Sequence, residues 1–261
     1  MIKFFRKIRQ KLISENRMKK YLFYAIGEIA LVMIGILLAL QINNWNEERK
    51  QLAYGQEILH ELIAEVNKNI SSFNWASENL KEGIEIQESM FKIEDLRGVS
   101  SDSLWYLFSM ANIDIKVSTN TFEKIKNQGL TRLSSNDSLN KKINEYFDKH
   151  IILFNKGIDF FWKRYEKRGD YLAFTNAVEY NSEYIVGLDK VSEETIRKEL
   201  FEFINLPRTK NHIEMIYFDA QSVLRRTEGV KKVSIDLVRS IHQELSKSNP
   251  DIEPLPDFGS L

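Results

Sequence analysis

The stretch YLFYAIGEIALVMIGILLALQI, residues 21–42, decides the organisation of this 261-residue chain. Glu28 is its only charged side chain, and residues 29–40 contain no polar side chain. As an α-helix, residues 21–42 would span about 33 Å, which exceeds the roughly 30 Å of a bilayer hydrocarbon core. Each Leu, Ile, Val or Phe favours insertion by about 0.3–0.6 kcal/mol, whereas an off-centre carboxylate costs at most about 3 kcal/mol. The stretch is therefore predicted to be a transmembrane helix.

The residues on either side of this stretch support the same interpretation. Residues 1–20 carry eight Lys and Arg side chains and a single acidic one, so the rest of the chain is acidic overall. The excess of positive charge places the N-terminal side in the cytoplasm. Tyr21, Tyr24 and Trp45 stand where aromatic side chains anchor a helix at the two membrane interfaces. We therefore expect a helix in contact with the lipid bilayer and a main domain outside the cytoplasm.

Two other interpretations of residues 21–42 are a buried core helix and a cleavable signal peptide. A core helix needs neither flanking aromatic residues nor eight preceding positive charges. A signal peptide has a shorter apolar region and small residues before its cleavage site, whereas Leu37 and Ala39 precede Gln41 here. These features favour an anchor that is not cleaved.

One face of the predicted membrane helix carries Ala25, Glu28, Gly35 and Ala39 at helical spacing. Small residues on one stripe let two helices approach closely, and a carboxyl group there can hydrogen-bond a neighbouring helix. We expect this face to pack against a second copy, forming a homo-oligomer, or against another membrane protein of the envelope. Two alternatives stay open for Glu28: it reaches back to the cytoplasmic headgroups, or it relays protons.

The sequence predicts four consecutive parts. They are a basic cytoplasmic segment at residues 1–20, the membrane helix at 21–42, an outer helical domain at 43–249 and a tail at 250–261. In the first part, apolar residues recur at helical spacing among basic ones. This pattern is typical of an interfacial amphipathic helix or of a disordered basic tail. The tail holds three of the four prolines, so it is expected to be extended.

An apolar period of 3.6 residues predicts that the outer domain is all-α, an elongated helical bundle that follows the single membrane helix. The first outer helix is expected to continue from the membrane to about Arg97-Gly98. Further helices are expected at residues 104–111, 121–128, 139–165, from 193, and from Pro207 to about 245, the last antiparallel to the first. Residues 169–191 are expected to be a loop. Alternating apolar residues at 113, 115 and 117 indicate a brief extended segment.

Short polar runs mark the helix starts. Ser101-Asp102-Ser103 and Ser135-Asn136-Asp137 are expected to cap the helices that follow them. Gly129 fits the left-handed position just past a helix at 121–128. The triplets at 102–104 and 137–139 read Asp-Ser-Leu and also resemble an acceptor sequence for serine O-glycosylation in some Gram-negative periplasms. Helix capping alone accounts for both triplets.

The sequence shows no pattern typical of an enzyme. The chain has no cysteine, which excludes disulfides, thiolate metal sites and cysteine nucleophiles. The four histidines stand singly, without the close second histidine of a helix-borne zinc site: His60, His150, His212 and His242. The spacing of Ser138 and Lys141 lacks the companion motifs of serine–lysine acyl enzymes. We therefore expect no catalytic residue, no cofactor and no metal, and because the main domain is acidic we expect no nucleic-acid partner.

Several segments resemble one bacterial protein family. They are MIKFFRKIR at 1–9, YAIGEI at 24–29 and IGILLALQINNWNEER at 34–49, with a second match in TFEKIKNQGL at 121–130 and NDSL at 136–139. The family comprises single-pass membrane proteins of Gram-negative bacteria and is catalogued as a domain of unknown function. The resemblance implies an inner-membrane protein with a periplasmic domain. It implies no activity, and it carries nothing beyond about residue 150.

Three classes of function fit these expectations. The leading hypothesis is a membrane-anchored periplasmic interaction or scaffold protein. A sensor or ligand-binding helical module is the second, and it would need a separate signalling partner because only about 20 residues lie in the cytoplasm. The third is an accessory subunit of a proton-driven envelope complex acting through Glu28. A buried polar pocket would favour the sensor, whereas a solid aromatic core would favour the scaffold; residues 139–165 are rich in aromatics, including Tyr146, Phe160 and Trp162.

Overall fold

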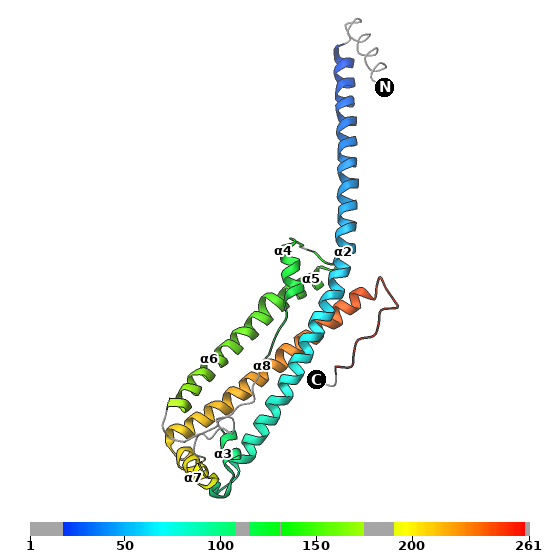
Figure 1. Ribbon diagram of the computed structural model, residues 1–261. Coiled ribbons are helices and arrows are strands. Elements are labelled where there is room, and N and C mark those ends of the chain that lie inside the picture. The colour runs from blue at the N-terminus through cyan, green and yellow to red at the C-terminus, as the bar shows by residue number, and fades with distance from the viewer. Residues whose placement is uncertain (1–17, 108–114, 131, 175–190, 259–261) are drawn as a thin grey trace. The chain divides into compact units, whose positions relative to one another are not determined.

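The computed structural model describes residues 18–107, 115–130, 132–174 and 191–258 (Figure 1). Every regular element in these ranges is a helix, which confirms the predicted all-α class for this part of the chain. The chain divides into two compact units, Met1–Gly55 and Gln56–Leu261. The predicted amphipathic segment at residues 1–13 lies outside the described residues.

The first described helix, α2 (Met18–Phe91), contains the whole apolar stretch and continues past Trp45 without a break, as predicted. It ends six residues earlier than predicted. The row of buried apolar side chains along the helix stops at this point, and the side chain of Phe91 is already 49% exposed. A short 3₁₀ helix, η1 (Leu96–Gly98), follows. Asp95 caps η1 by accepting the Arg97 N–H at 3.0 Å.

The prediction for the next helix was wrong by three residues. Helix α3 spans Ser101–Tyr106, and its N-cap is Ser100, whose hydroxyl accepts the Ser103 N–H. Ser101-Asp102-Ser103 is therefore the first turn of the helix and not its cap, and Asp102 there opposes the positive end of the helix dipole. Of the predicted extended segment, residues 115–119 form no strand, and position 113 lies outside the described residues.

Helix α4 (Asn120–Asn127) ends as the sequence predicted, with Gly129 in the left-handed conformation at φ 65°. The N–H of Leu130 donates to Ile125 and the N–H of Gly129 to Lys126, both at 3.1 Å. This pair of bonds is the Schellman ending of a helix, which needs a positive φ at its penultimate residue. Glycine meets that need without steric cost.

The aromatic-rich helix predicted at 139–165 is interrupted. It consists of α5 (Asp137–Glu145), a π-helical segment η2 (Tyr146–Ile151) and α6 (Ile152–Phe174). Asn136 caps α5 by accepting the Leu139 N–H at 3.2 Å, as predicted. The wide π turn lets the consecutive residues Tyr146 and Phe147 both lie in the core. The predicted loop is wrong for residues 169–174, which are helical, while 175–190 lie outside the described residues.

The last two helices begin as predicted. Ser192 caps α7 (Glu193–Ile204) by accepting the Thr195 N–H, and Pro207 occupies the first turn of α8 (Pro207–Leu245). Helix α8 lies antiparallel to the part of α2 that follows residue 55, as Figure 1 shows. Gln56 bonds Ser248, and Lys81 farther along α2 pairs with Glu228 at 2.9 Å. The predicted antiparallel pairing is therefore confirmed.

The core of the second unit is aromatic and aliphatic. Phe73 of α2 meets Phe154 of α6 with ring centroids 5.2 Å apart, and Phe122 of α4 stacks on Phe147 at 4.4 Å. A separate cluster joins the ends of α2 and α8 to α3 and α7, through Met90, Leu104, Leu107, Leu200, Phe203, Ile204 and Ile213. Phe160, which the sequence indicated as a core residue, is instead 62% exposed. Because residues 139–165 contain many aromatic residues, the sequence alone did not indicate which of them lie on the buried face.

The tail leaves α8 and is not helical over residues 252–258, as its prolines predicted. Its half-buried residues Ile252, Leu255 and Phe258 recur every three positions. The His242 Nε2–H donates to the Glu253 carbonyl at 2.9 Å, which fixes the beginning of the tail to α8.

Candidate functional site

The apolar part of α2 is the largest exposed hydrophobic surface among the described residues. Its Leu, Ile, Val and Met side chains between positions 26 and 42 are each more than half exposed, and Leu31 reaches 72%. Among the described helices, α2 alone is long and apolar enough to cross a membrane. A membrane anchor and a signal sequence near the N-terminus both meet this criterion. Monomeric soluble proteins rarely expose a contiguous apolar surface of this kind.

The predicted packing face lies on one stripe of α2. Ala25 and Glu28 are half-exposed, and Gly35 and Ala39 are exposed. A Cβ atom added to Gly35 would have no neighbour within 4 Å, so this position is open to a second helix. Trp45, the predicted interface anchor, is 65% exposed. Tyr21 and Tyr24 are helical, but their side chains lie outside the described ones.

The residues that could have suggested chemistry are dispersed. Among the described residues, no group of three or more His, Asp and Glu side chains could hold a metal ion. Ser138 is exposed, and the Lys141 ammonium lies 3.8 Å from Glu145 rather than on the serine. Both Asp-Ser-Leu triplets lie in the first turns of α3 and α5. Their acidic residues are placed to stabilise these helix ends whatever modification the serines carry.

Three glutamates link elements that are far apart in the sequence, and no sequence motif indicated them. Glu65 of α2 accepts two hydrogen bonds at the start of α4, from the Thr121 N–H at 2.7 Å and from its hydroxyl at 2.8 Å. The residue at the N-cap position, Thr119, makes no side-chain capping bond, so Glu65 supplies this cap from another helix. A helix start needs such acceptors because its first four N–H groups have no partner within the helix.

Glu193 makes the same kind of link between α7 and α3. Its two carboxylate oxygens accept the Ser101 N–H at 3.0 Å and the Ser101 hydroxyl at 2.5 Å. These hydrogen bonds hold the pKa of Glu193 below its ordinary value. Glu193 also lies in the first turn of α7, so one carboxylate stabilises two helix starts.

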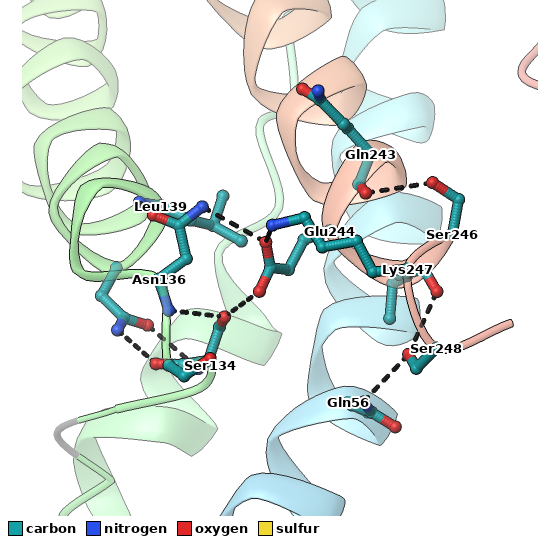
Figure 2. Close-up of polar contacts among 12 residues, drawn as sticks. Gln56, Ser134, Asn136, Leu139, Gln243, Glu244, Ser246, Lys247 and Ser248 are labelled. Atoms are coloured by element: carbon teal, nitrogen blue, oxygen red, sulfur yellow. Dashed lines mark hydrogen bonds and ion pairs between the residues drawn. The ribbon is translucent and has the colours of Figure 1, made fainter.

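Glu244 near the end of α8 is the third link, shown in Figure 2. Its carboxylate accepts hydrogen bonds from the Lys247 ammonium at 2.6 Å, from the Ser134 hydroxyl, and from the Asn136 amide at 3.2 Å. Bonds from Lys247 and Ser134 lower the pKa of Glu244 from its ordinary value. Because Asn136 is the N-cap of α5, Glu244 positions the residue that starts this helix.

A fourth set of polar contacts lies in the core. Asn69 of α2 accepts the Ser118 N–H at 2.8 Å and donates to the Ser118 carbonyl at 2.9 Å, so one amide pairs with the backbone of the irregular 115–119 segment. The Ser234 hydroxyl donates to Val230 and lies 2.9 Å from the Tyr146 hydroxyl, which therefore donates to it. Burial raises the pKa of Tyr146 to about 12, so this phenol stays protonated.

Apart from the buried Glu65 Oε1, which has no hydrogen-bond partner, the polar groups described above are paired, and each set joins elements that are far apart in the sequence. The arrangement therefore explains how short helices are held, and it assigns no catalytic step to any of them. The chain matches no protein-family model, no curated protein and no solved structure in the comparisons made. The resemblance to a family of single-pass membrane proteins thus stays a prediction that rests on the quoted segments.

Proposed function

We propose that the protein is an interaction or scaffold protein anchored in the bacterial inner membrane by α2, with its second unit in the periplasm. The observation that carries the proposal is the continuous exposed apolar surface of α2 between residues 26 and 42. Transferring this surface to lipid removes it from water, which is worth roughly 25 cal/mol for each Å². The eight basic side chains of residues 1–20 favour retention of that end in the cytoplasm.

The core of the second unit supports a scaffold over a sensor. Five aromatic side chains are buried there and form ring contacts, Phe73 with Phe154 and Phe147 with both Phe122 and Tyr146. A core of this kind holds the helices in fixed positions, because its buried side chains already contact one another. The carboxylates that could have served as ligand-binding groups are used as helix caps.

Topology tests the proposal directly. A reporter enzyme that is active only outside the cytoplasm, fused after Leu261, should be active, because the basic flank holds the other end inside. Neutralising the eight basic residues of the first 20 should reduce or mix this orientation, and neutralising eight exposed lysines and arginines of α6 and α8 provides the charge-matched control. Activity of a cytoplasm-specific reporter at the same position would contradict the proposal. Release of the chain from membranes by carbonate, with a shortened N-terminus, would indicate a cleaved signal sequence instead.

The proteins that bind this chain in its native membrane would identify the assembly that the proposed scaffold holds together. Affinity purification from membranes solubilised in mild detergent, followed by mass spectrometry, should recover other envelope proteins at stoichiometric yield. A variant with Leu31, Leu37 and Leu38 replaced by alanine keeps a helix of similar propensity while weakening insertion. Partners that depend on anchoring should be lost with this variant.

A further inference from the structure

Two exposed surfaces of the second unit carry opposite charges. The acidic surface lies on α2 and consists of Trp75, Glu78, Glu82 and Glu85. Their spacing of three, four and three residues places them on one helix face. The three carboxylates are exposed, and none forms an ion pair or hydrogen bond with another described residue. Trp75 beside them is 50% exposed.

The basic surface lies on the adjoining helices α6 and α8. It consists of Lys156, Phe160, Lys163, Phe218, Arg225 and Arg226. Arg164 joins the two helices by pairing with Asp219 at 3.2 Å, and its guanidinium lies 5.5 Å from the centre of the Phe160 ring. The Arg226 side chain covers Gly157, since a Cβ atom there would lie 3.0 Å from its Cδ. Phe160 and Phe218 are each 62% exposed.

The two surfaces cannot meet within one copy. Phe73 of α2 and Phe154 of α6 face each other in the core, so the outer faces of these helices point in opposite directions. A helix with its side chains is about 10 Å across, which places the surfaces on the order of 20 Å apart. The four cations of the basic surface form no ion pair with any described residue. In the part of the chain that the structure describes, neither surface is therefore neutralised by an ion pair of its own.

We propose that the acidic surface of one copy binds the basic surface of a second copy. The charges are complementary in sign, and the contact would cover Trp75 on one side and Phe160 and Phe218 on the other. An arginine beside an aromatic ring adds a cation–π attraction, as Arg164 and Phe160 already show. Because the two surfaces differ, the contact is head-to-tail and repeats from copy to copy.

The proposed anchoring strengthens this weak contact. Exposed ion pairs contribute little each in water, so isolated units would associate poorly. Copies held in one membrane share one orientation and a high effective concentration, which favours a head-to-tail contact that repeats in the membrane plane. The inference rests on the proposed function only because it takes all copies to be anchored in one membrane.

Cysteine cross-linking of the full chain in native membranes tests the contact, because the chain has no cysteine of its own. Glu82→Cys and Lys163→Cys are expressed together with different affinity tags, and a disulfide is catalysed by copper phenanthroline. We expect a mixed dimer carrying both tags, and little product from either variant alone. Dimers formed by Lys163→Cys alone would show a symmetric contact and overturn the proposal, as would the absence of the mixed dimer.

Charge exchange provides the specificity control. In the cross-linking pair, adding Arg225→Glu and Arg226→Glu to the Lys163→Cys copy should lower the yield several-fold. Adding Glu78→Arg and Glu85→Arg to the Glu82→Cys copy should then restore it, which a misfolded variant cannot do. Failure of this restoration would overturn the proposal. If cross-linking fails while the reporter after Leu261 is active outside the cytoplasm, self-association is wrong and the proposed function stands.

Discussion

At the scale of single residues, glutamates decide how the short helices are positioned. Glu65, Glu193 and Glu244 each accept donors that are 56, 92 and 110 residues away in the sequence, respectively. Each therefore couples the start of a local helix to the placement of a distant one. A helix of eight residues such as α4 is too short to be stable alone, so this coupling is expected to govern whether it forms.

Removal of the Glu65 carboxylate should destabilise the second unit. Glu65→Ala leaves the Thr121 N–H and hydroxyl without an acceptor, which costs about 1–3 kcal/mol of unfolding free energy. Chemical unfolding of the detergent-solubilised chain, followed by circular dichroism, measures this cost. Glu57→Ala on the same helix is the matched control, because Glu57 is exposed, and it should change stability by less than about 0.5 kcal/mol. Equal effects of both substitutions would contradict the capping role.

Acid should weaken the link made by Glu244. Lys247 and Ser134 lower its folded-state pKa below the ordinary 4.5, so the carboxylate contributes stability that is complete above pH 4.5. That stability is lost as the pH falls through the lower folded-state pKa. The difference in unfolding midpoint between the wild type and Glu244→Gln should therefore be largest near pH 7 and shrink below pH 4.5. Urea titrations at several pH values measure it, and a difference independent of pH would exclude an ionised Glu244.

The sequence predicted the caps that are local and missed those that are distant. Asn136, Ser192 and Gly129 act on backbone groups within a few residues, so their identity and spacing were sufficient. The Ser100 cap was missed, and Ser101-Asp102-Ser103 was predicted in its place, because four polar residues in a row offer equivalent starts. In the sequence, nothing distinguishes Glu65 and Glu244 from acidic residues that are exposed to water. Only the tertiary fold brings their partners within hydrogen-bonding distance.

At the scale of elements, the apolar period located the long helices but not their exact ends. Helix α2 continues through the predicted membrane exit, and α8 begins at Pro207, because proline is favoured in a first helical turn. The π segment was missed because the apolar residues on both sides fit a helical period closely enough to suggest one helix. The exposed Phe160 shows the same limit, since an aromatic residue contributes to the pattern whichever way it faces.

The apolar part of α2 should associate, once in a membrane, through the face that bears Ala25, Glu28, Gly35 and Ala39. Gly35→Leu should weaken association strongly, because it adds bulk where two backbones would approach. Glu28→Gln should weaken it only slightly, since hydrogen bonds between membrane helices average about 0.6 kcal/mol. An association assay in membranes on residues 15–50 compares the two variants.

The same assay includes Leu37→Ile as a control of unchanged bulk on the opposite face of the helix. Equal signals from the wild type and Gly35→Leu would exclude the packing face. A large loss in Glu28→Gln, with association intact in Gly35→Leu, would instead favour the proton-relay hypothesis.

At the scale of the whole molecule, the chain separates into two compact units with different surfaces. The first is exposed and apolar from residue 26 to 42, and the second has a buried core of its own beginning at Ile58. The sequence predicted an apolar helix followed by a helical domain, because a long apolar run and an amphipathic period are distinct patterns. It could not predict the opposed charged surfaces, which depend on which helices adjoin.

The second unit should fold without the first. Residues 46–261 expressed alone should be soluble and predominantly helical, because the described helices of this unit pack on one another. Circular dichroism and size-exclusion chromatography measure both properties. A spectrum dominated by β-structure, or recovery only in aggregates, would contradict the prediction. The same fragment extended back to residue 21 is the comparison, and it should require detergent.

The π turn between α5 and α6 has a consequence for how this protein can vary in length. A π turn holds one residue more than an α turn does, so α5 and α6 both face the core only because that residue is present. Removing one exposed residue there, Asp148 or Lys149, would convert the turn to ordinary α-helix while leaving each flanking helix intact. A deletion elsewhere in α6 would rotate every later side chain by about 100° and expose its buried face. Related chains that differ in length by one residue are therefore expected to differ at this turn.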